Sequence, residues 1–424
     1  MASVCLYFQV HQPMRVKRYR VFDVGWDHNY FNDSTETNLN NKKVLAKVAG
    51  KSYLPTNAIL LKLLKKHPEL VLTYSFSGVL LEQLEENFPE VLDSFKKLIN
   101  TGRVEVLSET YYHSLAFFYS RKEFETQVEM HKAKIKRVFG VTPKAFRNTE
   151  LAYTNELAKW ADEKGFTAIL AEGWDSFLGW RSPNFVYKPK GTKKIKTLLK
   201  NYKLSDDIAF RFSEKSWSQW PLTADKFADW VSRINGNGQV VNLFMDYETF
   251  GEHQWEANGI FEFLRQLPTE ILKHPDNNFL TVSEAAKAYP AMDEVDVPYI
   301  VTWADTERDL SAWVGNAIQT SAISLLYSLE KTILKANDPE LTHDWRRLQT
   351  SDHFYYMCTK WFSDGDVHKY FNPYESPYDA FISFMNVVSD LKLRIEKKKQ
   401  PQKSLNKKRK HIETSRNFPN SIGI

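Results

Sequence analysis

The fold of this chain is constrained most by a regular alternation of short apolar runs and helical patterns through its first 250 residues. Amphipathic stretches such as Ala58–Lys66 and Arg121–Phe139 lie between the runs and have helical spacing. The apolar runs, each of a length suited to one buried strand, are Val4–Val10, Leu70–Phe76, Val104–Leu107, Lys144–Asn148, Ala168–Ala171, Ile208–Phe212 and Val240–Met245. Such alternation is typical of parallel βαβ units, and seven of them favour a closed or nearly closed barrel over an open doubly wound sheet. No GxGxxG turn follows the first run, which argues against a dinucleotide cofactor.

The pattern changes to helices alone after residue 300. Long helices are predicted at Leu310–Ala336, Asp338–Phe362 and Pro377–Lys398, which together would make a helical bundle beside the barrel. The basic, strand-like stretch Lys188–Lys203 is interpreted as a hairpin inserted over the barrel. The predicted organisation is therefore a barrel with insertions at 1–300, a helical bundle at 301–397 and a basic, disordered tail without a catalytic role at 398–424.

Charge and composition exclude several functional classes. The net charge is +5, but the stretch Lys392–Lys410 holds more than this excess, so the body of the chain is close to neutral. We therefore expect no nucleic-acid partner. No stretch approaches the roughly 20 apolar residues of a membrane span, and the first apolar run lacks the basic flank of an export signal. With only two cysteines, Cys5 and Cys358, the sequence predicts a cytoplasmic protein without a disulfide framework. Nothing in the sequence defines its oligomeric state.

Functional side chains of a barrel lie at the carboxyl ends of its strands. The candidates that follow the predicted strands are His11, Glu109 with His113, Arg147 with Glu150, Arg211 with Trp217, and Asp246 with Glu248. Any one of them could be a helix cap or a packed residue. Acids, imidazoles and aromatic rings gathered at one rim are instead typical of a sugar site, in which carboxylates carry out acid–base or nucleophilic steps. A zinc hydrolase is the competing interpretation, and it is disfavoured because the sequence has no HExxH motif and no close pair of histidines.

Five segments, in order along the chain, resemble the signature regions of glycoside hydrolase family 57, the α-amylase-type barrel enzymes. The segments are His11-Gln12-Pro13, Gly102-Arg103-Val104-Glu105-Val106, Phe146-Arg147-Asn148-Thr149-Glu150-Leu151, Met245-Asp246-Tyr247-Glu248-Thr249-Phe250-Gly251 and Thr281-Val282-Ser283-Glu284-Ala285. The resemblance implies an incomplete seven-stranded (β/α)7 barrel followed by a C-terminal helical domain. It also implies a retaining mechanism with Glu150 as nucleophile and Asp246 as general acid/base. We expect this mechanism to need neither a cofactor nor a metal.

The resemblance also assigns substrate contacts. These are His11 and His113 on the barrel, Arg211 and Trp217 further along it, and Trp303, Trp313 and Asp352 from the helical part. Trp303, Trp313 and Asp352 are expected to face the same site as Glu150. For Trp313 and Trp303 the alternative is a place in the apolar core of the helical part.

The predicted activity is hydrolysis of α-1,4-glucosidic bonds in starch, glycogen or maltooligosaccharides, as in α-amylase. Transfer to a sugar hydroxyl, by a 4-α-glucanotransferase or a branching enzyme, is the first alternative. A glucan-binding protein with weak catalysis is the second, and it is disfavoured because both acids, Glu150 and Asp246, are present. Within the fourth segment Glu248 competes with Asp246 for the role of acid.

Overall fold

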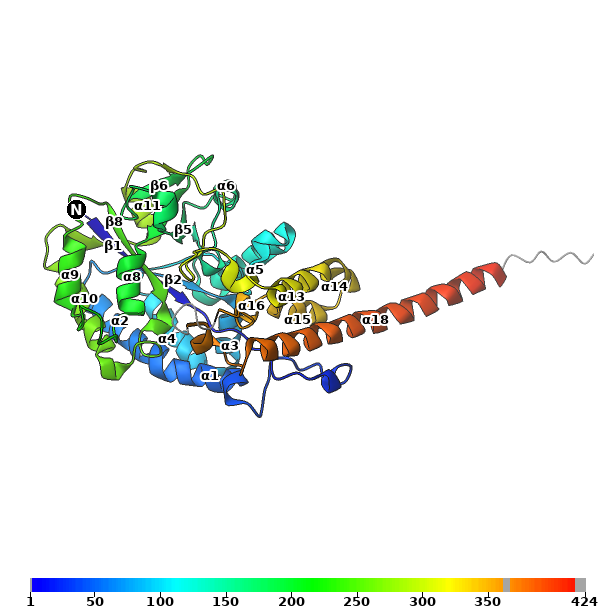
Figure 1. Cartoon of the computed structure of the whole chain (residues 1–424). Helices are drawn as coiled ribbons and strands as arrows, with labels where there is room; N and C mark the ends of the chain where they lie inside the picture. The colour runs from blue at the N-terminus through cyan, green and yellow to red at the C-terminus, as the bar shows by residue number, and fades with distance from the viewer. Residues whose placement is uncertain (1, 361–366, 416–424) are drawn as a thin grey trace, which may run out of the picture.

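The computed structural model describes residues 2–360 and 367–415, with residues 399–415 described by their backbone alone. It is an α/β structure in which helices surround two five-stranded sheets (Figure 1). The strands are β1 (Ala2–Val10), β2 (Leu72–Phe76), β3 (Val104–Val106), β4 (Ala145–Phe146), β5 (Ala168–Glu172), β6 (Val186–Pro189), β7 (Lys196–Lys200), β8 (Val240–Asp246), β9 (Asn277–Phe279) and β10 (Glu294–Val295).

Parallel pairing dominates both sheets. The first has the order β3-β2-β1-β8, with β9 also paired to the start of β1, and the second has the order β10-β6-β7-β5-β4. The pair β6–β7 is antiparallel and forms the hairpin predicted at Lys188–Lys203. Its second strand does not lie over the sheet, however. It is part of the sheet, because β7 pairs with β5 from Ala168↔Lys196 to Glu172↔Lys200.

Backbone contacts join the two sheets at two places. Ser108, just beyond β3, forms an isolated parallel bridge with Phe146 of β4. On the other side, Asn201 after β7 donates its backbone N–H to the carbonyl of Asn242 in β8 at 2.9 Å, and the Asn242 amide donates to the Leu199 carbonyl at 2.8 Å. The parallel strands β1, β2, β3, β4, β5, β7 and β8 are therefore linked one to the next, with β8 paired again to β1.

Helices cover the outer faces of the strands. Those that precede residue 300 are α1 (Asn41–Val48), α2 (Leu54–Lys66), α3 (Gly78–Asn87), α4 (Pro89–Ile99), α5 (Arg121–Phe139), α6 (Asn155–Glu163), α7 (Asp175–Leu178), α8 (Tyr202–Ala209), α9 (Ala224–Ser232), α10 (Ile260–Leu272) and α11 (Val282–Ala288). One apolar core joins β1, β2 and β8 to α2, α4, α9 and α10. Across the described residues, no helix has the length and apolar character that a membrane crossing requires.

The sixth predicted strand, Ile208–Phe212, is wrong. Residues 202–209 form α8. The helix begins directly after Asn201, because the Asn201 side chain caps the backbone N–H of Leu204. The place next to β5 that this strand would fill is taken by β7, from the segment interpreted as an insertion. Ile208 is buried on the inner face of α8, so its apolar character reflects helix packing.

The helices between residue 300 and α18 are shorter and more numerous than predicted. They are α12 (Ser311–Val314), α13 (Ala317–Ser328), α14 (Glu330–Ala336), α15 (Pro339–Arg347), α16 (Ser351–Tyr355), α17 (Val367–Phe371) and α18 (Pro377–Ser415). The predicted helix Leu310–Ala336 breaks at Gly315-Asn316, where Asn316 forms a capping box with Gln319. The predicted helix Asp338–Phe362 is interrupted before Ser351, and residues 361–366 lie outside the described part of the chain.

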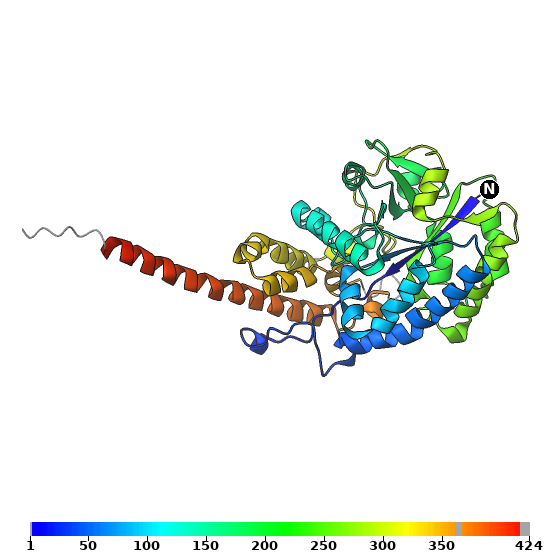
Figure 2. The ribbon, with the colours of Figure 1, turned by 180° about the vertical axis from the view of Figure 1, so that it is seen from behind.

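Helix α18 is longer than the predicted Pro377–Lys398. It continues to Ser415 and extends away from the body of the molecule (Figures 1 and 2). Its backbone is therefore helical through much of the segment 398–424 that was predicted to be disordered, while residues 416–424 lie outside the described residues. Lysine is the most frequent residue of this stretch and favours helix once a packed first part has formed the nucleus, although the stretch also contains Pro401.

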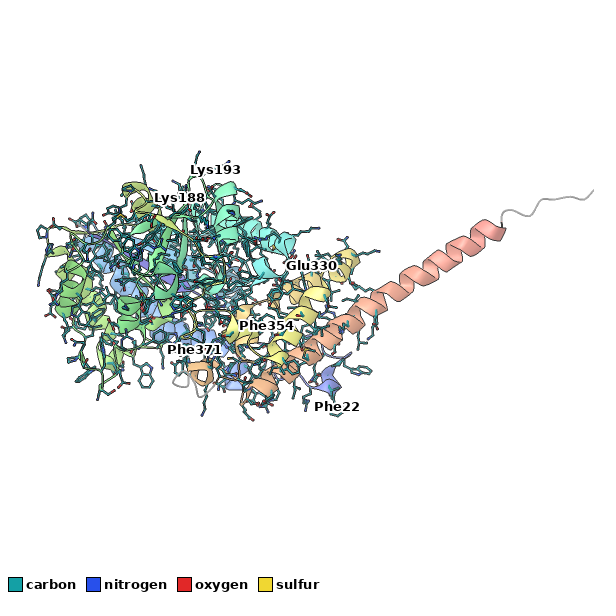
Figure 3. All side chains as sticks on the ribbon, turned by 45° about the horizontal axis from the view of Figure 1, so that its top comes forward. Phe22, Lys188, Lys193, Glu330, Phe354 and Phe371 are labelled. Carbon is teal, nitrogen blue, oxygen red and sulfur yellow. The ribbon has the colours of Figure 1, made fainter. Side chains whose placement is uncertain are left out.

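The segment that joins β1 to α1 packs against α18. The Asp390 carboxylate of α18, which is fully buried, accepts hydrogen bonds from the Gly25 backbone N–H (2.5 Å), from the His28 ring (2.7 Å) and from the Tyr30 hydroxyl. Phe22 lies at the outer end of this segment and is exposed (Figure 3). One buried acid thus connects the N-terminal part of the chain to its last helix.

We expect Asp390→Ala to lower the free energy of unfolding by about 2–4 kcal/mol, because the buried Tyr30 hydroxyl would lose its acceptor, as would the partly buried Gly25 N–H and the exposed His28 ring. The urea midpoint of unfolding measures this effect. Glu396→Ala on the exposed side of the same helix is the matched control and should change stability by less than about 0.5 kcal/mol. Equal stability of the two variants would contradict the role of Asp390.

Candidate active site

The carboxyl ends of the parallel strands bring four of the predicted site residues together. Asp246 is the last residue of β8, and it is in register with Gln9, two residues before His11. Glu150 lies in the turn that follows β4, with a left-handed backbone conformation of φ 59°. His113, in the loop after β3, also has a positive φ of 51°. Backbone strain at two neighbouring polar residues is typical of a functional site, where surrounding contacts hold it.

Glu150 is held by side chains from three parts of the chain. Its Oε1 accepts a hydrogen bond from the Ser351 hydroxyl at 2.8 Å and lies 3.5 Å from His113 Nε2. Its Oε2 accepts a hydrogen bond from the indole N–H of Trp303 at 2.9 Å. Because both oxygens have a donor, the orientation of the carboxylate is fixed before any ligand binds.

A chain of buried charges keeps Glu150 ionised. His113 Nδ1 donates to Glu109 at 3.0 Å, and the Arg147 guanidinium lies 3.9 Å from the same carboxylate. Burial favours neutral His113, but its bonds to Glu109 and Glu150 raise its pKa to about 9. Burial also opposes the ionised acids, yet His113 and Arg147 lower the pKa of Glu109 to about 2 and lower the pKa of Glu150 below its usual value. Glu150 is therefore an anion at neutral pH.

Asp246 has the opposite environment. Burial and the nearby charge of Glu150 raise the pKa of Asp246 to about 6. Glu248 has its pKa raised further, to about 8, by burial and by the charge of Asp246. Glu248 is 4% exposed, and its Oε1 accepts from the Tyr53 hydroxyl and from the Gln12 amide at 3.4 Å. Asp246 is only partly buried, so of the two acids it is the one that a ligand could reach.

His11 and Asp352 form a second pair beside His113. His11 Nε2 lies 3.0 Å from the Asp352 carboxylate, and its ring stacks on the His113 ring with centroids 3.9 Å apart. Burial, and then the charged His113, lower the pKa of His11. His11 is therefore the neutral one of the two stacked histidines. Asp352 has its pKa lowered despite burial, because His11 and His113 stabilise its ionised form.

The lack of two histidines close together in the sequence counts as evidence against a metal site. The fold nevertheless brings two histidines together in space. The structure brings His11, His113 and Asp352 together, with ligand atoms within 4.8 Å of one another, a spacing at which a metal ion could bind. The two rings are nearly parallel, at 20°. A metal ion lies in the plane of each imidazole that binds it, about 2.0–2.1 Å from the nitrogen, and two stacked rings cannot both meet this condition unless one turns. This geometry suits hydrogen bonding better than joint coordination.

The two tryptophans of the helical part have different environments. Trp303 is partly buried and donates to Glu150, and both the Arg147 guanidinium (4.9 Å) and the Lys200 ammonium (5.6 Å) lie over its ring. Trp313 is 1% exposed and packs in the apolar core, 6.0 Å from the Tyr355 ring. The expectation that Trp313 faces the site is corrected to the alternative, a core position, because a sugar ring cannot reach its faces.

Arg211 and Trp217 contact each other, as their predicted pairing requires. The Arg211 guanidinium lies 5.7 Å from the Trp217 ring and donates to Asp207 at 2.6 Å and to the Lys203 carbonyl at 2.9 Å. These bonds direct Arg211 to α8. A role of the pair in ligand binding stays a prediction.

Sequence reasoning missed Ser351, which donates to Glu150. The sequence offered one indication of its role, since Ser351 immediately precedes the predicted site residue Asp352 at the start of α16. Its position depends on tertiary contacts, because the backbone N–H of Ser351 donates to the His113 carbonyl at 2.9 Å and Thr350 pairs with Ser114. No local pattern predicts such a pairing.

One ionised and one protonated carboxyl group, both at the carboxyl ends of strands, can perform nucleophilic and acid–base chemistry on one substrate. The ionised group, Glu150, is oriented by two donors. The group with the raised pKa, Asp246, can release and recover a proton near pH 6.

Comparison with known proteins gives consistent matches. The family model described as "Glycosyl hydrolase family 57" matches residues 5–298. A Methanocaldococcus jannaschii protein named "Putative alpha-amylase" is 43% identical over 400 residues, which are 92% of this chain and 84% of that protein. An "Alpha-amylase" of Pyrococcus abyssi is 25% identical over 63% of this chain, which spans only 40% of that protein.

Two solved structures have the same fold. The 4-alpha-glucanotransferase from Thermococcus litoralis aligns with a TM-score of 0.61 and 20% identity over 83% of this chain and 56% of that chain. The GH57-type branching enzyme from Pyrococcus horikoshii aligns with a TM-score of 0.63 and 16% identity over 87% of both chains. At these identities the likeness is one of fold alone.

We expect Glu150→Gln to lower the pKa of Asp246 from its value of about 6, because the substitution removes the negative charge that opposes ionisation of Asp246. A pH titration of the Asp246 carboxyl carbon by 13C NMR measures the shift, with Asp246→Asn used to assign the signal. An unchanged titration in Glu150→Gln would show that burial alone determines the pKa of Asp246.

Proposed function

The chain belongs to glycosyl hydrolase family 57, and on that premise we propose that this glycoside hydrolase cleaves α-1,4-glucosidic bonds in starch, glycogen or maltooligosaccharides with retention of configuration. The observation that carries the proposal is the difference between the pKa values of two carboxyl groups. The pKa of Glu150 is lowered, whereas the pKa of Asp246 is raised to about 6. Retaining cleavage requires such a pair, one carboxyl ionised and the other protonated.

In the proposed mechanism Glu150 attacks the anomeric carbon while Asp246 donates its proton to the leaving glycosidic oxygen. The carbon–oxygen bond to the leaving sugar breaks as the ester bond to Glu150 forms. Asp246, now a carboxylate, takes a proton from water, and the oxygen of that water displaces Glu150 from the anomeric carbon. Two inversions at one carbon give net retention, and both acids return to their starting protonation states.

The contacts of the two acids after β8 support Asp246, and not Glu248, as the general acid/base. Glu248 is 4% exposed and is bonded to Tyr53 and Gln12, so a proton on it has no path to a leaving oxygen without rearrangement. A pKa of about 6 also suits an acid that must both donate and accept a proton near neutral pH, better than the value of about 8 for Glu248.

The remaining predicted contacts are proposed to bind sugar hydroxyls. His11 and Asp352 are bonded to each other at 3.0 Å, beside His113 and Glu150, and the other ring nitrogen of His11 is bonded to Ser77 at 2.6 Å. A sugar hydroxyl is therefore proposed to donate to Asp352 and to bind His11 by exchanging with one of these partners. Trp303 is proposed to contact the substrate through its edge, since cations lie against its faces. Arg211 and Trp217 are proposed to bind glucose units further from the bond that is cleaved.

For the fold we propose the incomplete seven-stranded (β/α)7 barrel within residues 1–300, with the helical residues 301–397 completing the site. The backbone links among β1, β2, β3, β4, β5, β7 and β8 support the closed order of strands. The hydrogen bonds from Ser351 and Trp303 to Glu150 support the contribution of the helical part. We also propose a cytoplasmic location, which suits the two free, buried cysteines.

Hydrolysis and transfer differ only in the second acceptor, water or a sugar hydroxyl. Product analysis on maltoheptaose separates them. Shorter chains with new reducing ends indicate an α-amylase, whereas products longer than the substrate indicate a 4-α-glucanotransferase, and new branch points indicate a branching enzyme. Binding without any product would support the catalytically weak glucan-binding alternative.

The pH profile of kcat/KM should be bell-shaped. Activity is lost as the pH falls through the lowered pKa of Glu150, because the nucleophile must be ionised, and as it rises through about 6, because Asp246 must be protonated. Replacing His113 with Asn should move the acidic limb to higher pH, since His113 stabilises ionised Glu150. An acidic limb that stays in place in His113→Asn would contradict this account.

Asp246→Ala should lose turnover of starch but regain it on an activated aryl α-maltooligoside when azide is added. Azide needs no general base, and Glu150 still forms the glycosyl-enzyme, so the product should be the retained α-glycosyl azide. NMR of the product gives its configuration. Glu150→Ala should give no retained azide product, and Glu248→Gln should need no azide. If Glu248→Gln instead shows the azide response, the acid is Glu248.

A further inference from the structure

Trp303 reaches Glu150 from a short loop, residues 301–309, that joins the barrel to the helices. Two of its non-glycine residues, Asp305 (φ 55°) and Arg308 (φ 53°), have the left-handed backbone conformation. Such conformations are costly for residues with a Cβ and persist only where surrounding contacts determine them. The loop therefore depends on specific bonds.

Arg308 makes these bonds at the end of the loop nearest the strands. Its NH1 donates to the Trp303 carbonyl at 2.6 Å and lies 3.7 Å from the Glu172 carboxylate, while NH2 lies 3.8 Å from Asp206. The face of its guanidinium lies 5.0 Å from the Tyr202 ring. A planar guanidinium can reach all of these partners at once, which a single ammonium cannot do.

One ionic partner of Arg308, Glu172, ends a strand, and the other, Asp206, lies in α8 and is bonded to the strand residue Lys200. Glu172 is the last residue of β5 and is fully buried, and Lys200 is the last residue of β7. Lys200 donates to Asp206 at 2.9 Å, lies 3.8 Å from Glu172, and places its ammonium 5.6 Å from the Trp303 ring. The two cations and two carboxylates neutralise one another, and they connect two strand ends to the loop that carries Trp303.

We propose that Arg308, held by Glu172 and Asp206, is a positioning residue that acts through Trp303 on Glu150. It holds the Trp303 backbone so that the indole N–H meets Oε2 of Glu150 at 2.9 Å. The loop is bonded to Glu150 a second time, since the Trp303 backbone N–H donates to the Glu150 carbonyl at 3.2 Å. This inference deepens the proposed function, on which it rests for its activity readout alone.

Arg308→Met removes the fork and keeps the apolar stem. The expected result is a fall in kcat of tenfold or more on a short maltooligosaccharide, with KM changed less than threefold. The acidic limb of kcat/KM should move up by about one pH unit, because ionised Glu150 loses a donor. His113, Arg147, Asp352 and Asp246, the other charged groups that face Glu150, are unchanged by the substitution.

Arg181→Met is the matched control. Arg181 is similarly buried, 18% exposed against 13% for Arg308, and it also joins a carboxylate, Asp293 at 3.3 Å, to a backbone carbonyl, that of Glu294 at 2.7 Å. It has no bond to Trp303 among the contacts of the described residues. Arg181→Met should leave the acidic limb in place. Arg308→Lys should fall between wild type and Arg308→Met, since it keeps the charge but not the fork.

A double-mutant cycle tests whether Arg308 acts through Trp303. Trp303→Phe keeps an aromatic ring but removes the indole N–H together with the five-membered ring, and it should shift the acidic limb as Arg308→Met does. In the Trp303→Phe background, Arg308→Met should then produce little further shift, because the bond that it controls is already absent. Full additivity of the two shifts would overturn the proposal, as would an unshifted limb in Arg308→Met.

A direct titration keeps this test separate from the proposed activity. The carboxyl carbon of Glu150, assigned by comparison with Glu150→Gln, is followed by 13C NMR in wild type, Arg308→Met and Arg181→Met. A raised pKa of Glu150 in Arg308→Met alone supports the positioning role even if the wild type cleaves no α-glucan, a result that would end only the proposed function. An unchanged titration in a folded Arg308→Met protein would overturn the positioning role.

Discussion

The structure depends on keeping one carboxylate, that of Glu150, ionised while it is largely buried. Isolated burial of such a charge would cost many kcal/mol, so the fold must bring partners to it. His113 supplies a positive charge 3.5 Å away, Glu109 in turn holds His113, and Arg147 lies against the same Glu109 carboxylate. These groups come from the ends of neighbouring strands. The order β3-β4 in the sheet arrangement is therefore also an electrostatic requirement of the site.

The same carboxylate connects the two halves of the chain. Ser351 and Trp303 follow the last strand of the structure, yet they donate to the two oxygens of Glu150. One apolar core contains side chains from α5 and β4 as well as Trp313, Trp345 and Leu391 of the later helices. A helical part with a separate core could shift against the strands. A shared core keeps the two donors, Ser351 and Trp303, at a constant position relative to Glu150, as a preorganised site requires.

Two acids with different environments are suited to the retaining chemistry proposed for this chain. Glu150 has cations and donors around it, whereas Asp246 has burial and the charge of Glu150, so their pKa values move in opposite directions. The raised pKa of Asp246 depends partly on the charge of Glu150, so the two acids are not independent residues. Trp303, with two cations over its ring, is proposed to act as a hydrogen-bond donor to Glu150 more than as a stacking platform.

The sequence by itself determined the parallel α/β class, six of the seven predicted strands, and the positions of Glu150 and Asp246 after strands, because buried strands and helix faces have local periodicity. It failed at Ile208–Phe212, where a five-residue apolar run fits a strand and a buried helix face equally well. It also could not distinguish Trp303 from Trp313, or identify Ser351, or bring His11 onto His113. Only the tertiary structure decided these points, because each depends on contacts between residues distant in the chain, and neither propensity nor spacing records such contacts.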